Sequence, residues 1–212
     1  NRGEAYQSKG DLEHAISDFD QAVKANPNYE TAYFNRGSAY RDRRDFGRAI
    51  EDFGQAVRIN PKNAQAFNYR GFAYWNRGDS AEAIADFEQA LKLDPKFSAA
   101  YTNRGMTYYD KRDYNRAIQD FDQALKLNPN SAQAYYNRGL AYRDKGDSGR
   151  AIADFDQAIK FDGKYAAAYA SRGLAYSNRQ DYSRAIFDLD TAIRLDGKYA
   201  GAYNDRGLVN VA

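Results

Sequence analysis

The tripeptide Asp-Phe-Gly, which places an aspartate on magnesium in protein kinases, occurs twice in one short stretch of this sequence. The two copies are Asp45-Phe46-Gly47 and Asp52-Phe53-Gly54. A kinase also needs a glycine-rich strand and a paired lysine elsewhere in the chain, and the sequence supplies neither. The tripeptides therefore need another explanation, and the pattern around Phe53 provides one.

Other residues that could carry catalysis are scarce. His14 is the only histidine, and its place on the polar side of an expected helix predicts a surface residue rather than a catalytic base. The chain has no cysteine, which excludes disulfides and thiolate chemistry. No His-rich cluster offers a zinc site, and no glycine loop between a strand and a helix offers a phosphate site. We therefore expect a non-enzymatic protein without a metal or cofactor.

The segment around Phe53 recurs along the whole chain. Its copies read AISDFDQAV, AIEDFGQAV, AIADFEQAL, AIQDFDQAL, AIADFDQAI and AIFDLDTAI, and they begin at Ala15, Ala49, Ala83, Ala117, Ala151 and Ala185. Each copy starts 34 residues after the previous one. A fixed period of this size is typical of stacked repeat proteins.

Each period predicts two helices. In the period that begins at Glu30, one first-helix face carries Tyr33, Gly37 and Tyr40, and one second-helix face carries Ala49, Phe53 and Ala56. Gly37 should face Ala49 and Phe53, because a residue without a side chain lets the two helices approach closely.

The residues between the helices predict where each one begins and ends. Asp45 precedes the second apolar series and should cap the free N–H groups at the start of that helix. Since Phe53 belongs to the apolar face of the same helix, both Asp-Phe-Gly copies are interpreted as structural. Pro61 should end the second helix, as should the proline or glycine in the same place of other periods. Glycine ends the first helix in alternate periods, at Gly10, Gly78 and Gly146; Arg44, Arg112 and Gln180 occupy that place in the others.

These residues resemble the tetratricopeptide repeat. The family pattern is matched by Tyr135, Gly139, Tyr142, Ala151, Phe155, Ala158 and Gly163, with glycine in place of proline. The resemblance implies an all-α fold, an α-solenoid in which antiparallel helix pairs stack into a right-handed superhelix. It covers residues 1–212 as a single array, with full repeats at 30–63, 64–97, 98–131, 132–165 and 166–199 and partial repeats at 1–29 and 200–212.

One departure from the family pattern is general. Arginine stands before the first-helix glycine, where the family usually has leucine, at Arg2, Arg36, Arg70, Arg104, Arg138, Arg172 and Arg206. An aspartate column on the second helices matches it, at Asp18, Asp52, Asp86, Asp120, Asp154 and Asp188. We expect Arg–Asp pairs packed between helices, because an unpaired charge near a helix seam is costly. The alternative is two independent solvated columns.

The resemblance also implies a concave groove, lined by first helices, that holds peptides. Its columns vary between repeats, and the residues that we expect to bind there are Phe34, Arg41, Asn68, Phe72, Trp75, Met106, Tyr109, Tyr136 and Arg143. Exposed aromatic residues in a concavity often anchor a partner, and this favours Trp75 and Tyr109. For Phe72 and Met106, packing between repeats is an equal alternative.

A nearly constant asparagine column is a further candidate for this groove. It contains Asn1, Asn35, Asn103 and Asn137, and it is interrupted by Tyr69, Ser171 and Asp205. An amide can both donate to and accept from a peptide backbone, so this column could hold an extended chain regardless of its sequence. A local role on the helix surface is the alternative. The carboxylate-gripping lysine set of chaperone-binding members of the family is absent.

Composition narrows the choice of partner. The net charge of +2, from 31 basic and 29 acidic residues, is too balanced to predict binding to nucleic acid or a membrane surface. No apolar run is long enough to cross a membrane. The chain opens inside a repeat and shows no signal peptide, which predicts a fragment and leaves a cytoplasmic or a periplasmic location open.

Three functions are compatible with these features. The leading hypothesis is a protein-interaction scaffold that binds a peptide or extended protein segment in the groove. The alternative is a self-assembling module with weak head-to-tail contacts, in which part of the apolar surface of Leu208, Val209 and Val211 faces outward and Asn210 makes that end more polar. A single-stranded RNA binder would need a basic groove, which the aspartates near Arg41 and Arg143 disfavour.

Overall fold

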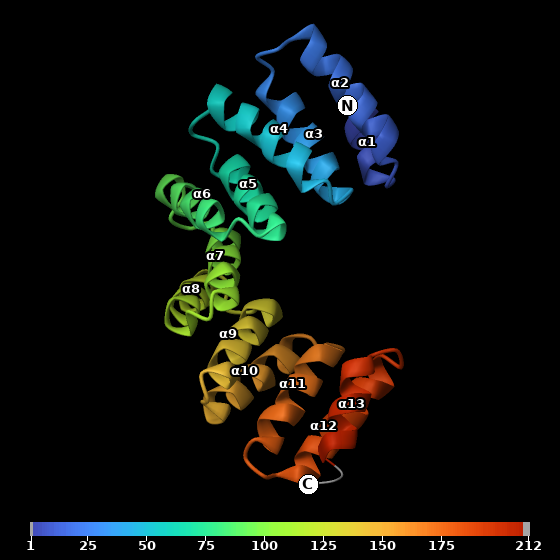
Figure 1. The fold of residues 1–212 in the computed structure, drawn as a ribbon, viewed down its shortest axis with the longest axis vertical. Coiled ribbons are helices and arrows are strands. Elements are labelled where there is room, and N and C mark those ends of the chain that lie inside the picture. Colours follow the sequence, from blue (N-terminus) through green and yellow to red (C-terminus); the bar gives the residue numbers. More distant parts are fainter. Residues whose placement is uncertain (1, 210–212) are drawn as a thin grey trace. The chain divides into compact units, whose positions relative to one another are not determined.

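The computed structural model describes residues 2–209 and contains thirteen α-helices and no β-strand within them (Figure 1). It comprises two compact units, unit 1 (Asn1–Thr107) and unit 2 (Tyr108–Ala212). The helices are α1 Arg2–Ser8, α2 Leu12–Ala25, α3 Glu30–Asp42, α4 Phe46–Ile59, α5 Ala64–Arg77, α6 Ser80–Leu93, α7 Ser98–Asp110, α8 Tyr114–Leu127, α9 Ala132–Asp144, α10 Ser148–Phe161, α11 Ala166–Ser177, α12 Tyr182–Leu195 and α13 Ala200–Val209.

The helices alternate between two kinds, as the sequence predicts. First helices from α3 to α13 begin at intervals of 34 residues, and second helices from α2 to α12 do the same. From α1 to α6 in unit 1 and from α8 to α13 in unit 2, each helix packs against its neighbours in the sequence, and first helices also contact one another, α3 with α5 and α9 with α11. These contacts make the units stacks of helix pairs, which confirms the α-solenoid class. None of the helices between residues 2 and 209 has the length and apolar character of a membrane span.

The residues between helices have the predicted roles. Asp45 accepts a hydrogen bond from the backbone N–H of Arg48 at 3.2 Å, which confirms it as an N-cap. The Arg48 side chain also bonds to Asp45 and lowers the pKa of its carboxyl group. Helix α4 ends at Ile59, two residues before Pro61. The Asp-Phe-Gly tripeptide at residues 45–47 is thus a helix start.

Each first helix from α1 to α11 is followed by a residue with left-handed backbone geometry. The glycines at this place have φ angles of +79° to +97°, and they are Gly10, Gly78 and Gly146. Three larger residues adopt the same geometry with φ near +60°, and they are Arg44, Arg112 and Gln180. The termination site therefore has one backbone conformation in both residue classes, although only glycine adopts it without steric cost.

The core is built from second-helix aromatic residues against first-helix glycines. Phe53 is fully buried, and a Cβ atom placed on Gly37 would lie 3.1 Å from its ring. The close approach to Phe53 is confirmed, but the next atom that this Cβ would meet is the Cβ of Asp52 rather than an atom of Ala49. Both Asp-Phe-Gly phenylalanines serve packing, since Phe46 lies against the same core cluster.

The predicted Arg–Asp pairs form bidentate hydrogen bonds between the two helices of one repeat. In each, Nε and Nη2 of the arginine donate to the two carboxylate oxygens, at 2.6–2.8 Å for Arg36–Asp52, Arg70–Asp86, Arg138–Asp154 and Arg172–Asp188. Arg2 and Asp18 pair in the same way. The aspartates of the four measured pairs are at most 6% exposed. The alternative of two independent solvated columns is wrong for these pairs.

The same arginines also reach back to the preceding repeat. The Nη1 atom of Arg138 donates to Asp122 at 2.6 Å, so one guanidinium joins two successive second helices. Equal bonds of 2.6 Å join Arg36 to Asp20, Arg172 to Asp156 and Arg206 to Asp190. Gly54 stands where the acid that would reach Arg70 is expected, and its ideal Cβ would lie 3.8 Å from Nη1 of Arg70. At the second Asp-Phe-Gly, Arg70 therefore lacks the acid on the preceding second helix that the arginines named above bind.

Candidate functional site

The predicted binding residues lie on the first helices, on the side that these helices share within each unit. We call this surface the first-helix face; in unit 1 it comprises α3, α5 and the start of α7, and in unit 2 the end of α7, α9 and α11. The alanines and glycines of the same helices, such as Ala32 and Gly37, are buried against second helices. The stacking of repeats therefore positions the variable residues side by side within a unit.

Phe34 belongs to the packing of unit 1 more than to its surface. Its ring stacks on Tyr69 with centroids 5.3 Å apart and meets the buried Phe53 edge-on at 5.7 Å. Arg41 covers Tyr69, with its Cζ atom 4.5 Å from the ring centroid. Tyr69, which interrupts the asparagine column in the sequence, thus joins two adjacent first helices, a role that the sequence analysis missed.

Phe72 and Trp75 form the main aromatic pair on the unit 1 face. Both lie on α5, their rings meet edge-on at 5.7 Å, and both side chains are partly buried. Met106 on α7 is also partly buried. These side chains retain accessible apolar surface on the first-helix face, as an anchoring role requires.

The asparagines bond mainly to one another and to neighbouring helices. Asn35 donates to Glu4 at 2.9 Å, and Asn103 donates to Asn68 at 3.0 Å. Asn68 and Asn137 are each only 2% exposed, and Asn137 accepts a bond from Gln133. Their burial contradicts the expectation that these two amides line an open groove, because a peptide cannot reach them. Asn1 lies outside the described residues.

In unit 2, Tyr136 packs inward and Tyr109 is tied to an acid. The Tyr136 ring lies 4.8 Å from that of Tyr165 and 5.9 Å from that of the buried Phe155. The Tyr109 hydroxyl donates to Asp144, and burial together with this aspartate raises the pKa of Tyr109. Tyr109 remains partly exposed, so part of its surface is available to a partner.

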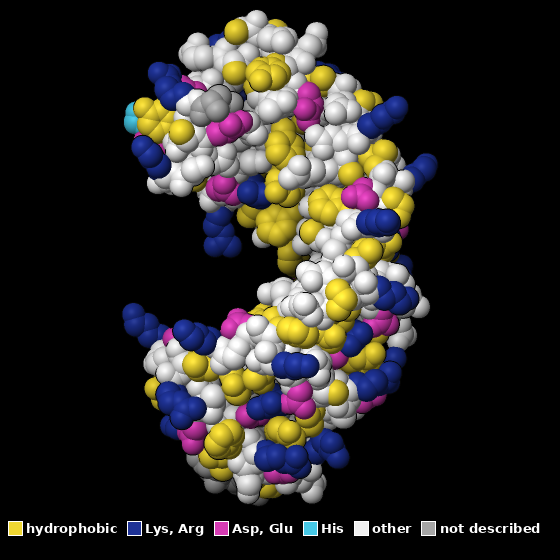
Figure 2. All heavy atoms as spheres, turned by 180° about the vertical axis from the view of Figure 1, so that it is seen from behind, with side chains coloured by type: hydrophobic (Ala, Val, Ile, Leu, Met, Phe, Trp, Pro, Cys, Tyr) yellow, Lys and Arg dark blue, Asp and Glu magenta, His cyan; other side chains and the backbone are white. Residues whose placement is uncertain are grey.

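The two arginines predicted for the groove are already ion-paired. Arg41 bonds to Asp42 through Nε at 3.0 Å and Nη2 at 2.7 Å. Arg143 bonds to Asp144 through Nε at 2.8 Å. Acidic and basic side chains also lie side by side over the surface shown in Figure 2 rather than in separate fields. The first-helix faces therefore present little net charge at their arginines.

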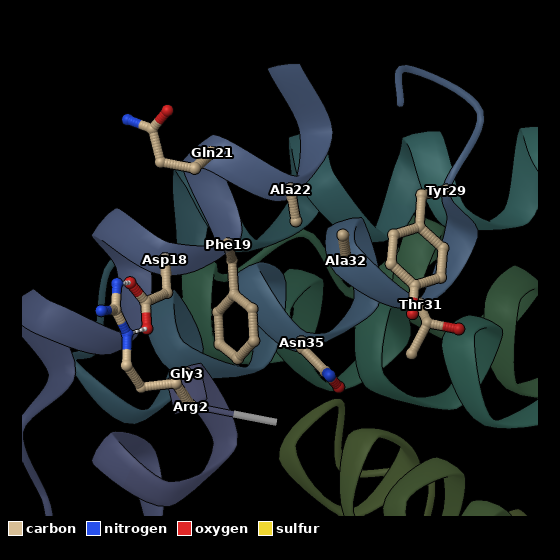
Figure 3. A pocket seen from close by; sticks show the side chains of 10 residues that line it. All are labelled: Arg2, Gly3, Asp18, Phe19, Gln21, Ala22, Tyr29, Thr31, Ala32 and Asn35. Atoms are coloured by element: carbon tan, nitrogen blue, oxygen red, sulfur yellow. Dashed lines mark hydrogen bonds and ion pairs between the residues drawn. The ribbon is translucent and has the colours of Figure 1, made fainter. Parts of the chain in front are cut away.

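A cavity of about 360 Å³ lies among α1, α2 and α3 in unit 1 (Figure 3). Ala22 and Ala32 are part of its wall, as are Arg2 and its partner Asp18. The corresponding alanines of the next repeat, Ala56 and Ala66, are covered by aromatic first-helix residues, Tyr33 and Phe67. The cavity thus occupies a place that repeat packing fills elsewhere, and we assign no ligand to it.

His14 has the surface position expected from the sequence. Its side chain is 68% exposed, and its Nδ1 atom lies 2.8 Å from Asp11. Its ring stacks on Tyr6 at 5.0 Å. Among residues 2–209, no group of three or more histidine, aspartate and glutamate side chains is arranged to hold a metal.

Comparison with known families agrees with this architecture. Two tetratricopeptide repeat models match the chain, one at residues 1–64, 34–96, 70–109 and 102–169 and the other at residues 166–199. The chain belongs to the tetratricopeptide repeat family, whose proteins are generally non-enzymatic scaffolds for protein–protein interaction. A search of curated protein sequences gave no match.

Solved structures share the fold at low sequence identity. PilW, described as a type IV pilus biogenesis factor, is 21% identical with a TM-score of 0.86, covering 98% of this chain and 94% of its own. YrrB, described as having an unusual peptide-binding site, is 21% identical with a TM-score of 0.70, covering 89% and 97%. The Cut9–Hcn1 complex of APC/C contains a chain 19% identical with a TM-score of 0.84; 98% of this chain matches 41% of that one.

Proposed function

We propose that the chain is a scaffold in which the first-helix face of a unit holds an extended segment of a protein partner. The observation that carries this proposal is the partly exposed aromatic pair of Phe72 and Trp75, on a face whose composition varies between repeats. Tyr109 supplies a second aromatic surface, fixed in orientation by its bond to Asp144. Rigid aromatic side chains lose little conformational entropy on binding, which suits them as anchors.

Replacing Trp75 and Tyr109 together by alanine should weaken partner binding by about tenfold or more, because loss of an aromatic anchor commonly costs about 2 kcal/mol. The measurement is a pull-down from native cell extract, followed by titration of the captured partner. The matched control is Phe187→Ala, which removes a 66% exposed aromatic residue from the second helix α12. Equal affinity in the double variant, with an unchanged helical circular dichroism signal, would reject these two residues as anchors.

A second candidate function is self-association through α13. Leu208 and Tyr203 on this helix are 62% and 46% exposed, and no atom lies within 4 Å of a Cβ placed on Gly207. Val209 is 5% exposed, so Leu208 supplies the outward apolar surface in the described part of this end; Asn210 and Val211 lie outside the described residues. Sedimentation should show weak, concentration-dependent association that Leu208→Glu reduces, since apolar exposure drives it. A monomer at all concentrations would exclude this candidate.

A further inference from the structure

Two arginines, one on each first-helix face, are paired with an acid by the same local arrangement. Each of Arg41 and Arg143 bonds to the aspartate that follows it in the sequence, at 2.7–3.0 Å. Their side chains are only 24% and 20% exposed. The two pairs lie at the same position of two different repeats, one in each unit.

Each aspartate of these pairs is also held by the preceding first helix. The side-chain amide of Gln7 donates to Asp42 at 2.8 Å, and the hydroxyl of Tyr109 donates to Asp144. A tyrosine hydroxyl is protonated at neutral pH, and burial together with Asp144 raises the pKa of Tyr109 further, so this hydroxyl can donate. Neither acid can leave its arginine without breaking a second bond.

This arrangement makes the arginines poor receptors for a carboxylate. An incoming acidic group would have to displace an aspartate that already has two partners, and it would meet that aspartate's charge. In unit 1, Tyr69 additionally covers the guanidinium of Arg41.

Beside these ion pairs, the same faces carry partly accessible apolar side chains. Unit 1 offers Phe72, Trp75 and Met106, and unit 2 offers Leu140 and Leu174, all partly buried. Such surfaces gain free energy by covering apolar side chains and gain little from charged ones.

We propose that the first-helix faces select an uncharged extended protein segment with large apolar side chains, and that the Arg41–Asp42 and Arg143–Asp144 pairs reject acidic segments. This inference rests on the proposed function and specifies its partner class. The pairs hold the two arginines in place and remove their attraction for acidic side chains of a partner, so acidic segments are disfavoured. Binding should accordingly depend little on salt and should not require a free C-terminal carboxylate.

The test begins with selection from a displayed library of random peptides on the wild-type chain, at low and high salt. The most enriched peptide is then synthesised in two forms, one as selected and one with its neutral polar residues changed to glutamate. The wild-type chain should enrich uncharged apolar sequences and bind the selected form about tenfold more tightly than the glutamate form. Amidating its C-terminus should leave affinity within about twofold.

The decisive variant is Asp42→Asn with Asp144→Asn, which keeps the side-chain shapes and releases both arginines from their counter-charges. This variant should bind the glutamate form about tenfold more tightly than the wild-type chain does. Selection of acidic peptides by the wild type, or equal binding of both forms, would overturn the inference and leave the scaffold function intact. Failure to enrich any peptide would instead reject the proposed function, and this inference with it.

Discussion

Replacing Arg138 by leucine is expected to destabilise unit 2 by about 3–5 kcal/mol, the usual cost of removing one partner from a buried ion pair. The change leaves Asp154, which is 5% exposed, without the bidentate hydrogen bonds from Arg138 that compensate its burial. It also removes the bond to Asp122 that joins successive second helices. Urea unfolding followed by circular dichroism would measure the loss.

The double variant Arg138→Leu with Asp154→Tyr, which restores the commoner family residues, should recover most of that stability. Asp122→Ala is the matched control, because it removes only the 40% exposed partner and should cost much less. Absence of coupling between Arg138→Leu and Asp154→Tyr in the double-mutant cycle would show that the two columns act independently.

In unit 1, Gly54→Asp would supply the acid that Arg70 lacks. This substitution places an acid within reach of Arg70 and should stabilise unit 1 by up to about 1 kcal/mol.

The stability lost in Arg138→Leu should depend on pH. Burial raises the pKa of Asp154, and the bonds from Arg138 oppose that rise, so removing the arginine should raise the pKa further. A carboxyl whose folded-state pKa lies above its unfolded value stabilises the fold when protonated, and this contribution is lost as the pH rises through the folded pKa. The deficit of Arg138→Leu should therefore be largest near neutral pH and shrink in acid. A deficit independent of pH would contradict the burial argument.

Alanine at Gly139 is expected to destabilise the fold by about 1–3 kcal/mol through overpacking, despite the better helix propensity of alanine. Its Cβ would lie 2.7 Å from the ring of Phe155, which is fully buried, so the ring or the helix would have to shift. Thermal or urea unfolding would measure this effect.

Gly149 provides the matched control for this substitution. It is an exposed helical glycine whose nearest atom to an ideal Cβ is 3.7 Å away, so Gly149→Ala should stabilise by about 0.5–1 kcal/mol. Opposite signs for the two substitutions would separate steric contact from helix propensity. A stabilising Gly139→Ala would show that the two helices separate at little cost.

Much of the architecture follows from the sequence because its determinants are local. The 34-residue recurrence fixed the alternation of helices, and Asp45 and Pro61 marked a helix start and stop, since capping and chain termination depend on neighbouring residues. The pairing of Arg36 with Asp52 was also predictable, because two unbroken charged columns on adjacent helices imply contact.

The tertiary structure decided which of the predicted surface residues remain accessible. Spacing placed Asn68 and Trp75 on one helix side, but only the approach of the neighbouring first helix buries the asparagine and leaves the tryptophan partly exposed. The same approach lets Gln7 reach Asp42, which holds the pair with Arg41. Burial and neutralisation depend on distances between repeats of a few ångströms, and a periodic sequence specifies the repeats without specifying those distances.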